Sequence, residues 1–353
     1  MNISVTLSEN KKVKPRFGEE AFPFAKVTTD HMFLMDYTRA KGWHDARIVP
    51  YEPLALDPFT NALHYGQSIF EGMKAYKTKD GGALLFRPYE NAKRFNLSAQ
   101  RMCMPELDPD IMVGSVVKLL EIEKDWIPAV QGMSLYIRPF MFATEPTINV
   151  ILPDAYLYMV ILSPFGSLYG AKPVRIAVET EYIRAGRGGT GAAKCAGNYA
   201  GAMLAVVEAK KRGFDQVLWL DGTHRKYIEE VSTMNVFFVI DDLVVTPAVS
   251  DSILDGVTRK SVVQILKDWG YTVEERQISI DELAEAHAHG RVKEVFCTGT
   301  AAVITSIGEI AWGDKAMVFH NMQIGDLTKR VYDELTGIQT GICPDTRGWT
   351  YQL

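Results

Sequence analysis

The sequence predicts a two-domain protein that mixes α+β and α/β organisation. The chain has 353 residues, and a domain typically takes roughly 150. It is 47% hydrophobic and 23% charged, which is ordinary for a globular protein with a large core. Residues 164–173 are rich in Pro, Gly and Ser, as linkers are. We therefore expect a smaller N-terminal α+β domain over 1–163, a linker over 164–173 and a larger C-terminal domain over 174–353.

The first domain begins with an irregular arm of about thirty residues, followed by strands and helices that do not alternate regularly. The segment FEGMKAYKTKDGGALLFRP predicts a β-hairpin that turns at residues 79–82. PYENAKRFNLSAQRM predicts a helix, because Pro88 suits a first helical turn. The apolar spacing of IMVGSVVKLLEIEKDWI predicts a second helix. SLYIRPFMFAT and AYLYMVILSPF are expected to be buried strands.

The second domain is expected to begin with the strand VRIAVE and the helix AGNYAGAMLAVVEAKKRG, which ends at Gly213. The strand DQVLWLD follows, and then a hairpin, STMNVFFVIDDLVVTPA, that turns at Asp241 and Asp242. DGVTRKSVVQILKDWG predicts a helix closed by Gly270. VEERQIS, VKEVFCTGTAAVITSIG and a last helix, IGDLTKRVYDELTG, complete the domain.

Charge and cysteine content narrow the class of protein. The net charge is −5 and the isoelectric point about 5.9, which argues against nucleic acid as a partner. The four cysteines form no C-x-x-C pair, so we expect free thiols in a reducing compartment. The N-terminal segment lacks the apolar stretch of a signal peptide, and no long apolar run predicts a membrane span. The sequence therefore predicts a cytoplasmic protein with no membrane partner.

Lys194 is the most unusual polar residue of the chain. It ends the glycine-rich run GRGGTGAAK, with small neutral neighbours on both sides. The run fits neither the Walker pattern nor a dinucleotide fingerprint. A lysine amine that is neutral can condense with an aldehyde to form a Schiff base. A solvated lysine that follows a flexible loop is the alternative reading.

Three polar residues that follow Lys194 in the sequence can be interpreted either as functional or as structural. Tyr199 lies on the predicted helix after Lys194, and a buried phenol needs a hydrogen-bond partner. Glu229 and Glu230 enter an apolar strand, where adjacent residues point to opposite faces. A carboxylate on the inner face is costly unless it is paired. The alternatives are a core tyrosine and two solvated carboxylates at a strand end.

Two turns and one arginine are possible anion sites. DGVTRKS, residues 255–261, opens a helix, and helix N-termini bind anions through exposed N–H groups. CTGTAA, residues 297–302, is a turn of small residues with hydroxyl groups. The arginine is Arg94, which by default would be a surface residue of its helix. His287 and His289 have H-x-H spacing but no apparent acidic or cysteine partner nearby, so no metal site is predicted.

Eight segments in this order resemble a known family. They are FAKVTTDHM, ALHYGQSIFEGMKAYK, LFRPYENAKRF, LYIRPF, GAAKCAGNYAGAMLA, EEVSTMNVF, DGVTRKS and EVFCTGTAA. Together they cover nearly the whole chain and resemble the branched-chain amino-acid aminotransferases, which are fold-type IV enzymes dependent on pyridoxal 5'-phosphate. The resemblance implies transamination of L-leucine, L-isoleucine and L-valine with 2-oxoglutarate, in a two-domain homodimer.

The resemblance also implies roles for individual residues around the cofactor. Lys194 would hold the cofactor aldehyde and move the proton of the substrate. Glu230 rather than Glu229 would pair with the pyridinium nitrogen, so that the ring accepts electrons. Tyr199 would donate its phenol to the cofactor O3′. Arg94, Val257, Thr258 and Thr300 would bind the cofactor phosphate. Thr233 would be a further residue of the cofactor site.

The implied substrate pocket must accept both apolar side chains and the side chain of glutamate. Phe24, Phe70 and Tyr136 match its apolar positions. Tyr65 and Arg138 match its polar side, and the backbone at Thr300 and Ala301 matches the site for the α-carboxylate. Because a methylene changes binding by only about 1–3 kcal/mol, the preference among the three substrates is not readable from sequence.

The chain departs from part of the family, and other functions stay open. Mammalian members carry a C-x-x-C pair after the GTA turn, whereas this chain has AAVI there, so thiol regulation by that pair is not expected. A D-amino-acid aminotransferase or an aminodeoxychorismate lyase would share the lysine and the glutamate. These enzymes would be expected to be shorter and to lack the EGMK and LYIRP segments. A non-catalytic anion-binding protein built on the glycine loop is the alternative from another class.

Overall fold

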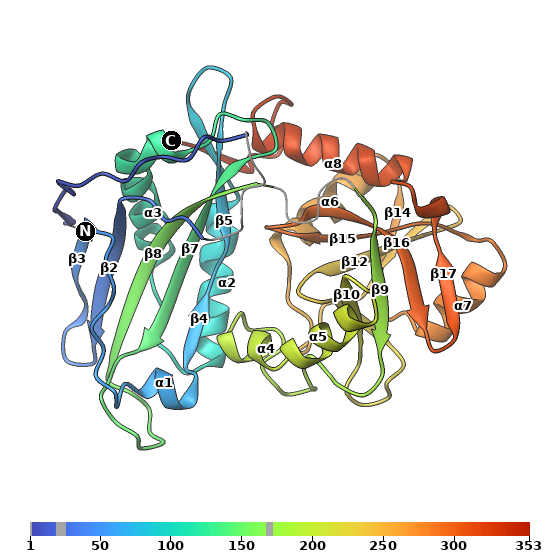
Figure 1. Ribbon diagram of the computed structural model, residues 1–353, viewed down its shortest axis with the longest axis horizontal. Coiled ribbons are helices and arrows are strands. Elements are labelled where there is room, and N and C mark those ends of the chain that lie inside the picture. Colours follow the sequence, from blue (N-terminus) through green and yellow to red (C-terminus); the bar gives the residue numbers. More distant parts are fainter. Residues whose placement is uncertain (1, 19–25, 167–171) are drawn as a thin grey trace. The chain divides into compact units, whose positions relative to one another are not determined.

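The structure is a computed structural model that describes residues 2–18, 26–166 and 172–353, and the chain divides into two compact units (Figure 1). Unit 1 comprises Met1–Ser167, Ala193–Gly197 and Gly337–Leu353. Unit 2 comprises Leu168–Ala192 and Asn198–Thr336. Phe24 and the centre of the expected linker, residues 167–171, lie outside the described residues. Each unit has its own sheet and its own core, and each is described by itself.

Unit 1 is built on a nine-stranded sheet in the order β1-β3-β2-β8-β7-β5-β6-β18, with β4 paired to β7. The strands are β1 (Ser4–Val5), β2 (His31–Thr38), β3 (Gly42–Pro50), β4 (Ser68–Phe70), β5 (Met73–Lys77), β6 (Ala83–Phe86), β7 (Ser134–Ala143), β8 (Ala155–Phe165) and β18 (Thr350–Gln352). Its helices are α1 (Asn61–Tyr65), α2 (Pro88–Arg101), α3 (Pro109–Glu123) and the 3-10 turn η1 (Lys124–Trp126). The hairpin of β5 and β6 and the helix that begins at Pro88 confirm the sequence predictions.

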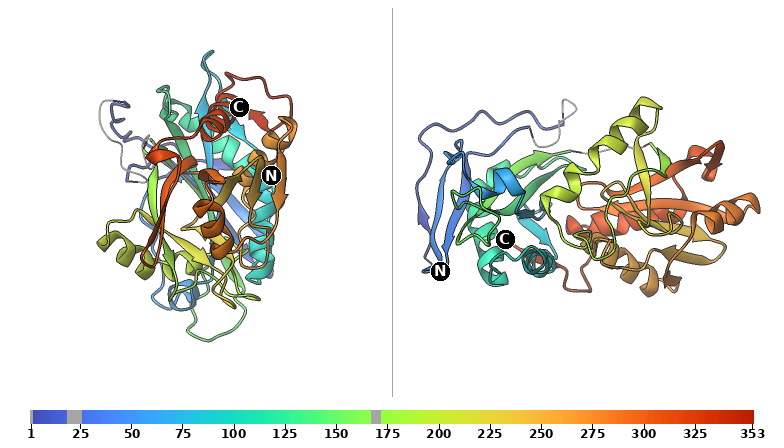
Figure 2. Two further views of the ribbon diagram at one scale, coloured as in Figure 1. Left: turned by 90° about the vertical axis from the view of Figure 1, so that its right-hand side faces the viewer. Right: turned by 90° about the horizontal axis from the view of Figure 1, so that it is seen from below.

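Strand alternation divides the residues of unit 1 between two faces of its sheet. Leu135, Ile137 and Met141 of β7 join one apolar core with Phe95 of α2 and Val116 of α3. These two helices lie on the same face of the sheet (Figures 1 and 2). Because successive strand residues point to opposite sides, the even-numbered residues of β7 face away from both helices.

A break between β4 and β5 places polar groups beside this sheet. β4 pairs with the second half of β7 and β5 with the first half. Between them the Glu71 N–H donates to the Pro139 carbonyl at 2.8 Å, opposite a residue that has no N–H to offer. A Cβ at Gly72 would overlap the Tyr136 hydroxyl, so glycine is required for this close approach.

Unit 2 holds a second nine-stranded sheet, in the order β11-β10-β9-β16-β15-β12-β13-β14, with β17 paired to β16. Its strands are β9 (Val174–Glu179), β10 (Gln216–Leu220), β11 (Ile228–Val231), β12 (Asn235–Ile240), β13 (Leu243–Thr246), β14 (Thr272–Glu275), β15 (Val292–Gly299), β16 (Val303–Trp312) and β17 (Lys315–Val318). Its helices are α4 (Ala196–Ala200), which begins in unit 1, α5 (Met203–Lys211), α6 (Val257–Asp268), α7 (Ile280–Ala288), the 3-10 turn η2 (His320–Met322) and α8 (Asp326–Gln339), which ends in unit 1.

Small side chains and aliphatic side chains form separate cores in unit 2. Alanines of α5 pack on Val217 and Trp219 of β10. Leu283 and Ala286 of α7 belong to a larger apolar core with Phe238 of β12. The sheet is mixed, because β9 runs parallel to both β10 and β16 while most other neighbours are antiparallel. An isolated bridge between Val231 and Met234 links β11 to the start of β12.

The helical content of unit 2 differs from the prediction in two places. The segment 196–213 is not one helix but two, because a turn at residues 201–202 separates α4 from α5. The helix α7 was not predicted, although Ser279 caps it by accepting a hydrogen bond from the Glu282 N–H at 3.0 Å. Within the described residues, no helix is both long enough and apolar enough to cross a membrane.

Candidate active site

Lys194 lies in the five-residue segment of unit 1 that interrupts unit 2 in the sequence. Its N–H donates to the Ser98 Oγ on α2 at 2.8 Å. Its carbonyl accepts from the Phe70 N–H on β4 at 3.0 Å, and a bridge joins Ile69 to Cys195. The side chain is half-buried, and its Nζ lies 5.1 Å from the centroid of the Phe70 ring. The backbone of the predicted Schiff-base lysine is thus held by a helix and a strand.

Arg94 is not a surface residue of α2 but forms a buried ion pair with Glu71. Its Nε and Nη2 donate to the two Glu71 carboxylate oxygens, each at 2.8 Å. The same carboxylate accepts from the Asn91 Nδ2 at 2.8 Å. Burial alone would raise the pKa of Glu71, but the charge and hydrogen bonds of Arg94, helped by Lys194 and Asn91, lower it below its ordinary value. Glu71 therefore carries a full negative charge at neutral pH.

The residues predicted to contact the substrate fall into three groups. Phe70, Tyr136 and Arg138 lie together: the Arg138 guanidinium is 4.5 Å from the Phe70 ring centroid, and its Nη2 donates to the Tyr136 hydroxyl at 3.1 Å. Tyr65 is half exposed, and its hydroxyl donates to the Ile148 carbonyl. Phe24 is outside the described residues.

Lys74, on the same face as Tyr136, is buried over the Phe165 ring, and burial lowers its pKa to about 7.

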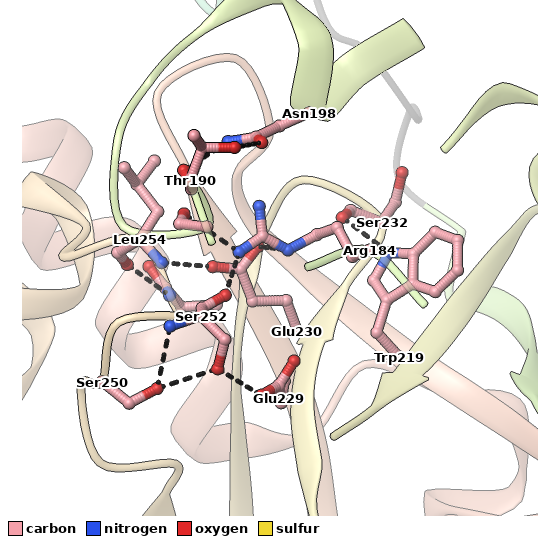
Figure 3. Close-up of polar contacts among 12 residues, drawn as sticks. Arg184, Thr190, Asn198, Trp219, Glu229, Glu230, Ser232, Ser250, Ser252 and Leu254 are labelled. Atoms are coloured by element: carbon pink, nitrogen blue, oxygen red, sulfur yellow. Dashed lines mark hydrogen bonds and ion pairs between the residues drawn. The ribbon is translucent and has the colours of Figure 1, made fainter. Parts of the chain in front are cut away.

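In unit 2, Glu230 is buried at the centre of a polar network on β11 (Figure 3). Its Oε2 forms an ion pair with the Arg184 Nε at 3.1 Å. Its Oε1 accepts from the Leu254 N–H at 2.7 Å. Arg184 also donates from Nη2 to the carbonyls of Gly191, at 3.2 Å, and Ser252. The orientation of the Glu230 carboxylate is therefore fixed, with a cation beside it.

Glu229 is buried as well, so the alternative reading of two solvated carboxylates at a strand end is wrong. Its Oε1 accepts from the Ser252 hydroxyl, so both carboxylates meet the turn 250–254. The ladder between β10 and β11 is irregular between Leu218 and Leu220, and such an irregularity re-aims side chains. Burial raises the pKa of Glu229 to about 7, with Arg184 opposing and Glu230 adding to the shift.

The glycine-rich run before Lys194 is anchored to the same turn. The N–H groups of Gly188 and Ala192 donate to Asp251, at 2.7 and 2.9 Å. A Cβ at Gly191 would lie only 2.5 Å from the Ser252 Cα, so a larger residue does not fit there. The run is therefore hydrogen-bonded at both its middle and its end, so the segment of unit 2 that precedes Lys194 has a defined conformation. Tyr199 follows on α4, where it is half-buried.

The predicted anion site at residues 255–261 is the N-terminus of α6. Gly256 is the N-cap, so no side chain caps the helix from that position, and Val257 and Thr258 are the first helical residues. A Cβ at Gly256 would overlap the amide of Asn235, whose Nδ2 donates to the Leu254 carbonyl at 3.0 Å. Exposed N–H groups at such a terminus attract anions.

The remaining predicted contacts lie in two turns of unit 2. Thr300 and Ala301 are half-buried in the three-residue connection between β15 and β16. The first residue of β16, Val303, has a φ of 57°, which costs a β-branched residue of order 1–3 kcal/mol. Thr233 is exposed in the turn after β11. The rings of His287 and His289 lie at hydrogen-bond distance from backbone carbonyls, and the described residues contain no group of three metal-ligating side chains.

Four contributors to this site were not identified from the sequence: Glu71, Ser98, Arg184 and Ser252. Their signals are weak, because a buried salt bridge and a hydroxyl contact depend on residues 23 to 96 positions apart. Arg184 precedes the glycine run by two residues, and Glu71 directly precedes Gly72. Only their position beside residues already singled out could have drawn attention to them.

The family model described as amino-transferase class IV matches residues 68–310 of this chain. The match includes the lysine, the strand carboxylates and the start of α6. Because it spans more than half of the chain, the chain belongs to the class IV aminotransferases.

Curated relatives narrow the family further. The chain is 50% identical to branched-chain-amino-acid aminotransferase 2 of Bacillus subtilis (strain 168), over 99% of this chain and 97% of the relative. It is 46% identical to a branched-chain-amino-acid aminotransferase of Mycobacterium tuberculosis (strain CDC 1551 / Oshkosh), over 94% and 92%. Within class IV, the chain is a member of the branched-chain-amino-acid aminotransferase family.

Solved structures agree with this assignment. The branched-chain amino acid aminotransferase from Escherichia coli is 28% identical, with a TM-score of 0.73, and the match covers 91% of this chain and 98% of that one. The branched-chain aminotransferase from the thermophilic archaeon Thermoproteus uzoniensis, solved with norvaline, is 26% identical, with a TM-score of 0.75 over 91% and 99%. The fold class expected from the resemblance, the two-domain fold of fold-type IV aminotransferases, is therefore confirmed.

Proposed function

We propose that this protein catalyses the pyridoxal-phosphate-dependent transamination of L-leucine, L-isoleucine and L-valine with 2-oxoglutarate, yielding branched-chain 2-oxo acids and glutamate. The observation that carries the proposal is the buried pair of Glu230 and Arg184, 3.1 Å apart. A nearby carboxylate favours the protonated form of a pyridine nitrogen, and Glu230, held in place by Arg184, would supply it. Full-length similarity to branched-chain-amino-acid aminotransferases supports the same conclusion.

The residues present fit pyridoxal phosphate by the chemistry of their donors. When bound, the cofactor supplies an aldehyde carbon that bonds to an amine and a ring that accepts electrons from the substrate. Lys194 would provide the amine and later carry the proton to and from the substrate Cα. Tyr199 would donate its phenol to the ring hydroxyl. Arg94, together with Val257, Thr258, Thr233 and Thr300 in the second unit, would hold and surround the phosphate.

The substrate side would use the face of unit 1 that points away from α2 and α3. Phe70 and Tyr136 would contact the apolar side chain, with Phe24 as a further apolar contact. Arg138 is already oriented by the Tyr136 hydroxyl, so its guanidinium would bind the side-chain carboxylate of glutamate, with Tyr65 on the same polar side. The backbone at Thr300 and Ala301 would bind the α-carboxylate. One pocket would thereby accept apolar and acidic side chains in turn.

Replacement of Lys194 by Ala tests the central assignment. The variant is expected to stay folded but to lose transamination and the yellow colour, because no other amine bonds to the aldehyde. Absorption spectra before and after borohydride, with a coupled 2-oxoglutarate assay, measure both effects. Lys210→Ala, an exposed lysine of α5, is the matched control and should behave as the parent. Turnover by Lys194→Ala, or a parent protein that stays colourless with added cofactor, contradicts the proposal.

Replacement of Glu230 by Gln tests the electrostatic role of the carboxylate. The variant is expected to bind pyridoxal phosphate yet to lose roughly 100-fold or more of its rate, since a preorganised charge at the reacting group is removed. Steady-state kinetics with the loaded enzyme measure this loss. If the rate is unchanged, the carboxylate does not serve the ring nitrogen.

A panel of amino donors separates the proposed activity from its alternatives. With 2-oxoglutarate as acceptor, Leu, Ile and Val should react, and D-Ala should not. Reaction with D-Ala and not with the L-amino acids would identify a D-amino-acid aminotransferase instead. A protein that binds phosphate but neither cofactor nor amino acid would be an anion-binding protein.

We also propose a cytoplasmic homodimer. Unit 1 exposes two apolar groups: Leu54, Leu56, Phe59 and Leu63 before and within α1, and Ile148, Val150, Ile151 and Leu152 after β7. Large exposed apolar patches are typical of interaction surfaces. Analytical ultracentrifugation should give twice the mass of the chain, and a monomer at micromolar concentration would contradict this.

A further inference from the structure

Glu229 and Glu230 form a buried carboxylate pair whose two members have different partners. Glu230 has the ion pair with Arg184 and the N–H of Leu254. Glu229 has one hydrogen bond, from the Ser252 hydroxyl, and its Oε2 has no hydrogen-bond partner among the described residues. An ionised carboxylate that is buried with one bare oxygen is costly, whereas the neutral acid is much less so. The geometry therefore places a proton on Glu229 rather than on Glu230.

The charges around Glu229 lead to the same assignment. The charged groups that act most strongly on it are the cation Arg184 and the carboxylates Glu230 and Asp221. Asp221 stays ionised, because four backbone N–H groups overcome the effect of burial and lower its pKa to about 2. Arg184 already neutralises Glu230, so ionised Glu229 would have no cation of its own. Burial accordingly raises the pKa of Glu229 to about 7.

The group of Arg184, Glu229 and Glu230 can balance one further positive charge if Glu229 loses its proton. Resting on the function proposed above, that charge would be the protonated ring nitrogen paired with Glu230. A cation bound there attracts Glu229 as well as Glu230, and it favours the ionised form of the neutral acid. We propose that Glu229 is a proton-releasing partner of Glu230, neutral in the cofactor-free protein and ionised as a second counter-charge once a protonated ring is bound.

Ser252 couples the two carboxylates physically. Its hydroxyl donates to Glu229 while its carbonyl accepts from Arg184 (Figure 3). Its N–H and hydroxyl are in turn held by the Ser250 Oγ, at 3.3 and 3.0 Å. A hydrogen bond from Ser252 favours the charged form of Glu229, so the ionised carboxylate keeps a donor in place. Glu229 thus acts through its neighbours, as a positioning residue.

Calorimetric titration with pyridoxal 5'-phosphate tests the proposal. Binding is measured at pH 6.5 in buffers of different ionisation enthalpy, which gives the number of protons released. The parent protein should release up to about three quarters of a proton more than Glu229→Gln, because an amide cannot ionise and an acid with a pKa of about 7 is mostly protonated at this pH. Glu208→Gln, an exposed residue of α5, is the matched control and should release as many as the parent. Equal release by the parent and Glu229→Gln overturns the proposal.

A second measurement does not depend on the folding of that variant. In infrared difference spectra of the parent at pH 6.5, binding of pyridoxal 5'-phosphate should remove the carbonyl band of a protonated carboxylic acid. Without the Ser252 hydroxyl, the ionised form of Glu229 loses its hydrogen-bond donor, so the acid stays protonated to a higher pH. In Ser252→Ala, binding should therefore remove the band at a higher pH than in the parent. Binding without loss of the band overturns the proposal. A protein that does not bind the cofactor at all contradicts the proposed function instead, and the two failures are therefore distinguishable.

Discussion

Removing the carboxylate that faces Arg94 is the change whose cost can be worked most directly from the structure. Glu71 and Arg94 are almost fully buried and share two hydrogen bonds of 2.8 Å. In Glu71→Gln the guanidinium is left without its counter-charge, and one amide N–H₂ faces another donor. Breaking one partner of a buried pair typically costs about 3–5 kcal/mol. Since the glutamine oxygen still accepts one bond, we expect a loss near the lower limit, about 3 kcal/mol.

Thermal unfolding of the cofactor-free protein measures this loss. In a unit of 150–250 residues, about 3 kcal/mol corresponds to a fall of roughly 6–12 °C in the transition midpoint. The double variant Glu71→Leu with Arg94→Met removes both charges, and it should be less destabilised than Glu71→Gln alone. If the separate effects of Glu71→Leu and Arg94→Met simply add in the double variant, the pair is not coupled and the reasoning is wrong.

Added anion connects the same variant to function. Arg94 is proposed to bind the cofactor phosphate, so a phosphate group should replace the lost counter-charge in Glu71→Gln. Saturating pyridoxal 5'-phosphate is therefore expected to raise the midpoint of Glu71→Gln more than that of the parent. An equal rise in both proteins would show that the phosphate does not reach Arg94.

Two further changes test the network of unit 2. The pKa of Glu229 is raised from 4.5 to about 7, so between these values the unfolded chain is ionised while the folded chain keeps its proton. Folding stability should then fall as pH rises from 4.5 to 7 and stay level above, by about 3 kcal/mol in all. Glu229→Gln should abolish this fall, and thermal midpoints at pH 5 and pH 8 measure it. Gly191→Ala should destabilise by about 1–3 kcal/mol, because its Cβ would meet the Ser252 Cα at 2.5 Å; an unchanged midpoint would show that the loop is not packed on the turn.

Much of the secondary structure was predictable because local rules and tertiary packing agree there. Pro88 begins α2 and Gly270 follows α6 with a φ of 83°, as the sequence indicated. The turn at Asp241 was placed correctly between β12 and β13. The pattern Ser279 to Glu282 is also a helix-start signal, so the start of α7 is predictable from local sequence.

The break between α4 and α5 could not be found in the same way. Residues 196–213 are dominated by helix-forming residues, and propensity alone favours one continuous helix. Ala202, Ala205 and Ala209 pack closely on Val217 and Trp219, and this packing sets the direction of α5 independently of α4. Tertiary contacts of this kind are invisible to a reading of neighbouring residues.

The residues of the site also divide into those that the local sequence indicates and those that it does not. Lys194, the pair of Glu229 and Glu230, and the start of α6 could be singled out because each stands out against its local sequence, whereas only the resemblance chose Glu230 over Glu229. Glu71 and Arg184 could not, because each matters as the ion-pair partner of a residue that is distant in the sequence. Arg94 gave no local signal, and only the resemblance assigned it to phosphate. In the structure it is neutralised by Glu71. A phosphate that binds there must compete with this carboxylate, which lets the protein hold Arg94 in place before the cofactor arrives.

Preorganisation of this kind has a consequence in both units. Each proposed contact to the cofactor, Arg94 in unit 1 and Glu230 in unit 2, is already ion-paired within its own unit. Charged groups held in this way need little rearrangement when a ligand binds, so more of the interaction energy is retained. The paired partners Glu71 and Arg184 therefore keep the opposite charges buried and oriented before the cofactor binds, while Glu71 also competes with the phosphate for Arg94.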